Sequence, residues 1–278
     1  MASEVPQRDA GSVEESLERI GELDARLHSV IAIDPEAQAR AGEAEAELRR
    51  RGPRGPLHGL PLLVKDNIDT AGSLATTAGS AALSDNVPGR DAPVVAALRA
   101  AGMVVVAKTN LSEWANFRSS CSASGWSALG GLTANPYALD RSAGGSSSGS
   151  AAAVAAGLAA VALGTETHGS ILCPAALCGC VGLKPTVGLC SSEGVVPISS
   201  TQDSVGPITS TVSLAAAVLD AICGGDHLGA LEAGAHGLRI GVPRSLGWGR
   251  RAELDGACER ALDALGASGV RVVDAVTL

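Results

Sequence analysis

Two loops rich in glycine and serine are the places in this chain where hydroxyl chemistry is most expected. The first covers residues 144–150 and the second residues 164–170, with an apolar run at 151–163 between them. Glycine and serine let a backbone bend sharply and leave N–H groups free to point at a ligand. A flexible linker is the usual alternative for one such loop, but these loops are flanked by apolar segments. A helix-like spacer over the apolar run would bring serines of both loops to one pocket.

A serine hydroxyl needs a neighbouring base before it can act as a nucleophile. None of the five histidines accompanies a Gly-x-Ser-x-Gly turn between a strand and a helix, which disfavours a Ser–His–Asp hydrolase. A lysine can serve instead if it is neutral near pH 7, since desolvation lowers a lysine pKa by as much as ~3–5 units. Lys65 follows residues 62–64, an apolar stretch that we interpret as a short buried strand. An exposed surface lysine is the ordinary alternative, and the position at the end of this strand favours the buried one.

A set of motifs extends from about residue 58 to 207, over half of the chain. In order, they are Leu63-Val64-Lys65-Asp66-Asn67, Lys108-Thr109-Asn110-Leu111-Ser112-Glu113-Trp114, the two glycine/serine loops, and Cys180-Val181-Gly182-Leu183-Lys184-Pro185-Thr186. With these motifs in this order, the chain resembles the amidase signature family, and most of all its bacterial peptide amidases. The resemblance implies an amidohydrolase that converts a primary carboxamide, such as the C-terminal amide of a peptide, to a carboxylate and ammonia. It implies neither a metal nor a cofactor.

The same resemblance assigns roles to residues of the two loops and to Lys65. Ser170 would be the nucleophile and Ser146, at the spacing found in the family, the bridging serine. Lys65 would be the base that accepts the proton relayed through Ser146. The family has a cis peptide bond before the bridging serine, and Gly144 and Gly145 provide backbone freedom there. Ser147 is expected to brace the loop by hydrogen bonds.

The second loop supplies the implied oxyanion hole and also departs from the family pattern. The donors implied by the resemblance are the backbone N–H groups of Thr167, His168, Gly169 and Ser170. His168 stands where most members have Gly and the peptide amidases have Asp. Its ring either crowds the acyl site or is a tolerated loop substitution. Glu166 and Leu172 replace the common Asp and Arg, so an ion pair expected elsewhere in the family is absent here.

The composition indicates a protein with a large aliphatic core and no strongly basic surface. Hydrophobic residues make up 46% of the chain and aromatic residues only 2%, so Ala, Val, Leu and Ile must fill the core. A formal charge of −8 argues against nucleic-acid and anionic-membrane partners. The longest uncharged apolar run, at 151–163, is too short for a membrane span. The seven cysteines lack zinc-site spacing, and free thiols with no signal-like N-terminus predict a cytoplasmic protein.

The pattern of apolar residues predicts an α/β fold in which a mixed twisted sheet is covered by helices on both faces. We expect one truncated domain over 1–278, with an N-terminal helical layer at 12–51 and a signature core at 58–207. The pattern predicts helices at 12–33 (ending in a strand-like piece), 34–50, 91–101, from 109 onward, 212–222 and 252–265, and strands at 62–64, 103–107, 238–242 and 270–276.

The end of the chain bears on its activity. Leu278 comes directly after an expected strand, whereas members of the family usually continue much further. We therefore expect this chain to match only the first part of an amidase. Two alternative functions stay open, a catalytically inactive truncated homologue and an amidotransferase-type subunit that passes ammonia to a partner. The expected partner is a small amide or amidated peptide, and the sequence gives no indication of a partner subunit.

Overall fold

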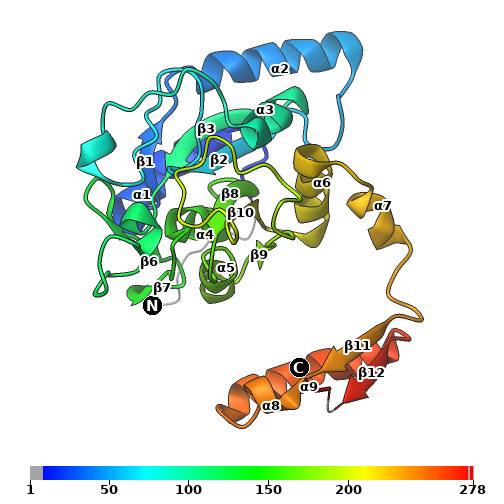
Figure 1. Ribbon diagram of the computed structural model, residues 1–278. Coiled ribbons are helices and arrows are strands. Elements are labelled where there is room, and N and C mark those ends of the chain that lie inside the picture. Colours follow the sequence, from blue (N-terminus) through cyan, green and yellow to red (C-terminus); the bar gives the residue numbers. More distant parts are fainter. Residues whose placement is uncertain (1–8, 275, 278) are drawn as a thin grey trace. The chain divides into compact units, whose positions relative to one another are not determined.

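The computed structural model describes residues 9–274 and 276–277 of the chain (Figure 1). The chain divides into two compact units, with the border between His227 and Leu228. Each unit has its own β-sheet. The expectation of one domain over 1–278 stays a prediction.

A six-stranded sheet forms the centre of the first unit, in the order β1-β3-β2-β8-β10-β9. Strand β2 pairs in parallel with both β3 and β8, whereas β1, β10 and β9 run antiparallel to their neighbours. The sheet is therefore mixed, as predicted. The strands are β1 (Val30–Ile33), β2 (Pro61–Lys65), β3 (Val104–Thr109), β8 (Val161–Glu166), β9 (Val181–Gly182) and β10 (Ser204–Thr209).

Helices cover both faces of this sheet, as the sequence predicted. Ser12 caps the first of them, because its Oγ accepts a hydrogen bond from the backbone N–H of Glu15 at 3.2 Å. The helices are α1 (Val13–Leu27), α2 (Ala37–Arg51), α3 (Pro93–Ala100), α4 (Ser148–Ala155), α5 (Leu172–Cys178) and α6 (Val212–Cys223), with short 3₁₀ turns η1 (Ala81–Leu83) and η2 (Glu113–Asn116). Two small hairpins complete the unit, β4 (Trp126–Ser127) with β5 (Gly131–Leu132) and β6 (Ala134–Asn135) with β7 (Ala138–Ser142).

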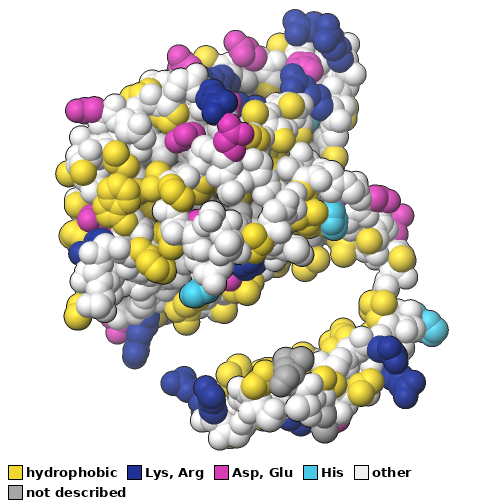
Figure 2. Space-filling model, viewed as in Figure 1, with side chains coloured by type: hydrophobic (Ala, Val, Ile, Leu, Met, Phe, Trp, Pro, Cys, Tyr) yellow, Lys and Arg dark blue, Asp and Glu magenta, His cyan; other side chains and the backbone are white. Residues whose placement is uncertain are grey.

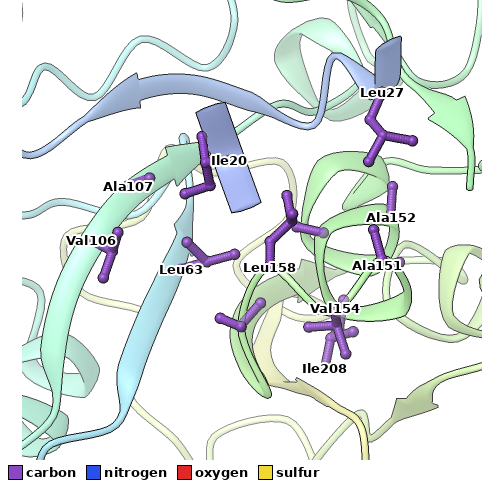
Figure 3. Close-up of a cluster of buried hydrophobic side chains, with 14 of the residues drawn as sticks. Ile20, Leu27, Leu63, Val106, Ala107, Ala151, Ala152, Val154, Leu158 and Ile208 are labelled. Carbon is purple, nitrogen blue, oxygen red and sulfur yellow. The ribbon is translucent and has the colours of Figure 1, made fainter. Parts of the chain in front are cut away.

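The main core lies between the sheet, α1 and α4 (Figure 3). Ile20 and Leu27 of α1 meet Leu63 of β2 and the alanines of α4 in one buried cluster. Side chains of a strand alternate between its two faces, so Leu63 and Lys65 point toward α4 while Leu62 and Val64 point away. On that other face, α3 packs against α6, and α6 packs against β10. This alternation delivers Lys65 to the same side of the sheet as the start of α4.

The second unit is a small βαβ arrangement. Its strands β11 (Arg239–Val242) and β12 (Arg271–Asp274) pair in parallel, and α9 (Ala252–Ala267) connects them. The short helix α8 (Arg244–Gly247) follows β11, and α7 (His227–Glu232) lies at the border of the two units. Arg244 pairs with Glu259 of α9 and with Asp274 of β12, which ties the three elements together.

Charged side chains of both signs lie interspersed on the face shown in Figure 2. A group of basic side chains gathers at the end of α2, where Arg49, Arg50 and Arg51 occupy the last helical turn. Cations are favourable there because the carboxyl end of a helix carries partial negative charge. Among the described residues, no helix combines the length and the apolar character needed to cross a bilayer.

Two sequence-based expectations about elements are wrong, and strand β10 was not predicted. The segment from Thr109 onward does not open a helix, because Thr109 ends β3 and the next turn has Trp114 and Ala115 at positive φ. The apolar run 151–163 is not one helical spacer, since Gly157 at φ 70° follows the end of α4 and the run continues into β8. In strand β10, Pro207 pairs with Leu163 of β8, although proline is uncommon within paired strands.

Candidate active site

Lys65 is fully buried at the end of β2, and polar atoms surround its amine. Nζ donates to Ser146 Oγ at 2.8 Å, to Thr165 Oγ1 at 2.8 Å and to the Thr165 carbonyl oxygen at 3.3 Å. Burial lowers the pKa of Lys65 to about 7, although the carboxylates of Glu166 and Asp203 favour the charged form. A large fraction of the amine is therefore neutral at neutral pH and able to accept a proton.

Ser146 lies in the glycine/serine loop just before α4. The peptide bond between Gly145 and Ser146 is cis, and Gly144 has φ 76°. A side chain at residue 145 would lie 2.4 Å from Ser112 Oγ, so only glycine fits this position. Ser112 also donates its backbone N–H to the Ser146 carbonyl at 3.0 Å. These contacts fix the hydroxyl of Ser146 against Lys65.

Ser147 joins the first loop to the second. Its backbone N–H donates to the Ser170 carbonyl at 3.0 Å, and its Oγ donates to the Thr165 carbonyl at 3.2 Å. The Thr165 N–H donates back to Ser147 Oγ at 3.3 Å. These hydrogen bonds join residue 147 of the first loop to residues 165 and 170 of the second, so the two loops lie side by side. Among the described residues, no hydrogen bond joins the hydroxyls of Ser146 and Ser170, and the proton relay through Ser146 stays a prediction.

The loop at 167–170 presents backbone N–H groups beside Ser170. Within the described residues, the N–H groups of His168, Gly169 and Ser170 donate to no protein acceptor. Gly169 has φ 88°, a conformation that favours glycine. The His168 side chain is exposed, whereas Thr167 and Ser170 are buried. The free donors agree with an oxyanion hole, which itself remains a prediction.

Two carboxylates brace this loop, and sequence reasoning assigned them no such contacts. Glu166 Oε2 accepts the N–H groups of Ile171 at 2.7 Å and Leu172 at 2.9 Å. Asp203 Oδ1 accepts the Thr167 hydroxyl at 2.5 Å, and its Oδ2 accepts the N–H groups of residues 198 and 199. The sequence signal for Glu166 was its departure from the common Asp. Its longer side chain spans the turn to the start of α5.

The Amidase family profile matches residues 11–277 of the chain. The chain belongs to the amidase family. Its backbone is similar to that of the peptide amidase from Stenotrophomonas maltophilia, with a TM-score of 0.86 and 47% identity over 95% of this chain and 58% of that one. The fold and the family resemblance inferred from the sequence are thereby confirmed.

Curated relatives in the amidase family show the same likeness. A probable amidase of Arabidopsis thaliana is 53% identical over 218 residues, which cover 78% of this chain and 43% of the relative. A glutamyl-tRNA(Gln) amidotransferase subunit of Anaeromyxobacter dehalogenans is 44% identical over 277 residues, covering 94% of this chain and 55% of the relative. The chain thus spans about half the length of the curated relatives it matches.

The cysteines of this amidase-family chain form no disulfide among the described residues. All seven are free thiols. Burial raises the pKa of Cys178 and of Cys180 to about 12, so neither is a ready thiolate. Among the described residues, no group of three or more His, Cys, Asp or Glu is arranged to hold a metal ion. Cys178 behaves as a small buried hydrophobe inside the core cluster.

Proposed function

We propose that this chain carries a Ser–cis-Ser–Lys site that hydrolyses a primary carboxamide to a carboxylate and ammonia. The observation that carries the proposal is the buried amine of Lys65, whose pKa is lowered to about 7, at 2.8 Å from Ser146 Oγ. An amine that is partly neutral at pH 7 is a competent base for a serine relay. Lys65, Ser146 and Ser170 are the proposed catalytic residues.

In the first half of the reaction, Ser170 Oγ attacks the amide carbonyl and forms the acyl C–O bond. Its proton passes to Ser146 Oγ, while the Ser146 proton passes to the lone pair of Lys65 Nζ. The carbonyl oxygen becomes an oxyanion, which the N–H groups of Thr167, His168, Gly169 and Ser170 stabilise. A single donor of this kind typically contributes ~3–4 kcal/mol to the transition state.

Collapse of the tetrahedral species breaks the C–N bond. The Lys65 ammonium returns its proton through Ser146 to the leaving nitrogen, which departs as ammonia. Water then attacks the acyl-enzyme, with its proton following the same path to Lys65. Breakdown of this second adduct restores the Ser170 hydroxyl and releases the carboxylate. The cycle consumes one water and needs no redox partner.

The proposed substrate is a small amide or an amidated peptide. The support is the 47% identity to the Stenotrophomonas maltophilia peptide amidase over 95% of this chain. Ammonia release from a C-terminally amidated dipeptide, compared with an aliphatic amide, tests the substrate class. Turnover of the aliphatic amide alone would overturn the peptide assignment. We also propose a cytoplasmic location, which the free thiols support.

An amidotransferase-type subunit is the second candidate function. It is supported by the 44% identity to the glutamyl-tRNA(Gln) amidotransferase subunit of Anaeromyxobacter dehalogenans. This candidate predicts that the chain copurifies with a partner and transfers ammonia to it. An inactive homologue, the third candidate, predicts a folded chain that does not react with an active-site probe.

A fluorophosphonate probe tests the nucleophile, because it phosphonylates an activated serine and releases fluoride. We expect the 278-residue chain to be labelled, Ser170→Ala to lose all labelling, and Ser146→Ala to label at least ~100-fold more slowly because the relay is cut. The matched control is Ser84→Ala, an exposed serine away from the site, which should label like the parent. Labelling that persists in folded Ser170→Ala would overturn the assignment.

A further inference from the structure

Thr165 supplies two of the three polar contacts of the Lys65 amine. Nζ lies 3.3 Å from the Thr165 carbonyl oxygen and 2.8 Å from its Oγ1, and the third contact is Ser146 Oγ. A neutral amine has two N–H donors and one lone pair. If both donors go to Thr165, the lone pair is left for the Ser146 hydroxyl, which is the arrangement a base needs. The position of the Thr165 hydroxyl therefore decides where the lone pair points.

A buried asparagine holds that hydroxyl. Asn67 Nδ2 donates to Thr165 Oγ1 at 3.0 Å, and Asn67 is only 2% exposed. Its backbone is fixed as well, because the Asn67 carbonyl accepts the N–H of Val196 at 2.9 Å. Asn67 follows Lys65 by two residues, in the turn after β2. The end of β2 and the turn after it thus contain both the proposed base, Lys65, and Asn67, which holds the Thr165 hydroxyl beside that base.

The carbonyl oxygen of the Asn67 side chain, Oδ1, takes no part in holding Thr165. Among the described residues, Asn67 Oδ1 is buried and has no hydrogen-bond partner. Asn67 also lines a small cavity together with Thr165, Thr167, Asp203, Ser204 and Val205. Buried polar atoms nearly always have partners, so an unpartnered one calls for an explanation. An apolar side chain of similar volume would fill this place without that cost.

We propose that Asn67 is a positioning residue, which acts through Thr165 Oγ1 to aim the lone pair of Lys65 at Ser146. The proposal rests on the proposed function of Lys65 as the base. Among the described residues, Asn67 makes no hydrogen bond to Ser146 or Ser170. In this arrangement the hydrogen-bond chain runs from Asn67 through Thr165 and Lys65 to Ser146. These residues come from β2 and the turn after it, from β8, and from the loop before α4.

The charges around Lys65 determine how a substitution at Asn67 would change the pKa of Lys65. The carboxylates that act on Lys65 are Glu166, at the end of β8, and Asp203, just before β10. Both favour the protonated amine, and burial opposes them. A neutral amide at residue 67 adds no further negative charge. A carboxylate at this place would raise the pKa of Lys65 and move the neutral form to higher pH.

The test is the rate of fluorophosphonate labelling as a function of pH, in the 278-residue chain. Asn67→Leu removes the hydrogen bond to Thr165 and the unpartnered oxygen together. We expect its maximal labelling rate to fall at least ~10-fold while its melting temperature stays the same or rises. A merely structural role predicts the reverse pattern, a lower melting temperature with an unchanged labelling rate, and that result would overturn the proposal.

A double substitution tests whether Asn67 acts through Thr165. If it does, Asn67→Leu placed in a Thr165→Val background should slow labelling no further, because the contact is already lost. If the double variant is labelled more slowly than Thr165→Val by the full factor that Asn67→Leu causes alone, the proposed path through Thr165 is contradicted. Asn67→Asp is the second probe should the leucine variant fail to fold. The pH midpoint of the labelling rate in Asn67→Asp should move upward by more than about one pH unit. An unchanged midpoint counts against the proposal.

Asn135 provides the matched control. It is also a buried asparagine, but its amide contacts the Leu177 and Ser142 carbonyls and the Tyr137 N–H. Asn135→Leu should lower the melting temperature and leave the pH midpoint of labelling unchanged. The two proposals fail separately. If the parent chain is not labelled at Ser170, the base itself is wrong, whereas normal labelling with no effect of Asn67→Leu sinks only the positioning role.

Discussion

Lys65 Nζ lies 2.8 Å from Ser146 Oγ, although 81 residues separate the two along the chain. The contact forms because β2 ends at Lys65 in the middle of the sheet, with α4 beginning on the same face. Removal from water keeps much of the amine neutral, and the Ser112 N–H holds the Ser146 carbonyl by a hydrogen bond. The proposed chemistry depends on this one contact, and the predictions below concern the groups that maintain it.

Glu166 raises the pKa of Lys65 by its negative charge, so removing that charge should shift the pH profile. Glu166→Gln keeps an oxygen that can accept the N–H groups of Ile171 and Leu172. The pKa of Lys65 should fall below about 7, and the midpoint of the labelling rate should therefore move to lower pH. Glu193→Gln, on an exposed carboxylate paired with Arg90, is the control. A midpoint that stays or rises would argue against Lys65 as the titrating base.

Lys108 and Asp66 form a buried ion pair, with Nζ and Oδ1 3.5 Å apart. Lys108 also donates to the Ile68 carbonyl at 2.6 Å and to Thr76 Oγ1 at 2.9 Å. Lys108→Met would leave the carboxylate alone in the interior, so we expect a loss of ~3–5 kcal/mol in the free energy of unfolding. Urea denaturation measures it. The double variant Lys108→Met, Asp66→Asn should regain part of the lost free energy of unfolding, because no buried charge is left alone. A loss equal to the sum of the two single losses would contradict the pairing.

The same lysine gives stability a defined pH dependence. Burial lowers the pKa of Lys108 to about 8, below its value of ~10.4 in the unfolded chain. Between these values the unfolded state binds more protons, so stability should rise with pH by up to ~1.4 kcal/mol per pH unit. Denaturation at pH 8 and pH 10 should show a smaller rise in Lys108→Met than in the parent. An identical rise would mean that Lys108 does not titrate in this window.

Gly149 allows α4 to start where Ser146 needs it. A Cβ at this residue would lie 2.3 Å from the Ser29 carbonyl and 2.5 Å from the Asn110 backbone nitrogen. Gly149→Ala should therefore displace the start of α4, with both a lower melting temperature and slower labelling. Gly42→Ala is the opposite control, since nothing lies within 4 Å in the middle of α2 and alanine should add ~1 kcal/mol. Equal effects of the two changes would refute the packing argument.

His168 should act only through its backbone, because its ring is exposed while its N–H has no protein acceptor among the described residues. His168→Ala is expected to keep the labelling rate within about two-fold, since it changes no backbone donor. Measurement of the rate across pH 5 to 8 checks this. A rate that rises about ten-fold or more would show that the ring crowds the acyl site.

The sequence determined the type of fold and the residues of the proposed site. Alternating strands and helices, the two glycine/serine loops and Lys65 after an apolar strand are local patterns, and local patterns can be recognised along a chain. The family motifs then related Lys65 to Ser146 and Ser170 by order and spacing. Strand β10 was not predicted, because its pairing with β8 joins segments that lie far apart in sequence.

Only the tertiary structure decided how the amine is surrounded. The contacts of Lys65 with Thr165, and of Asn67 with Thr165, join residues that lie 100 and 98 positions apart. The reach of Glu166 to the start of α5 depends on the exact path of one turn. Such contacts depend on how strands and helices pack, because burial and direction are properties of three-dimensional neighbours. A pKa lowered by burial belongs to the folded molecule and cannot be read from a lysine in a sequence.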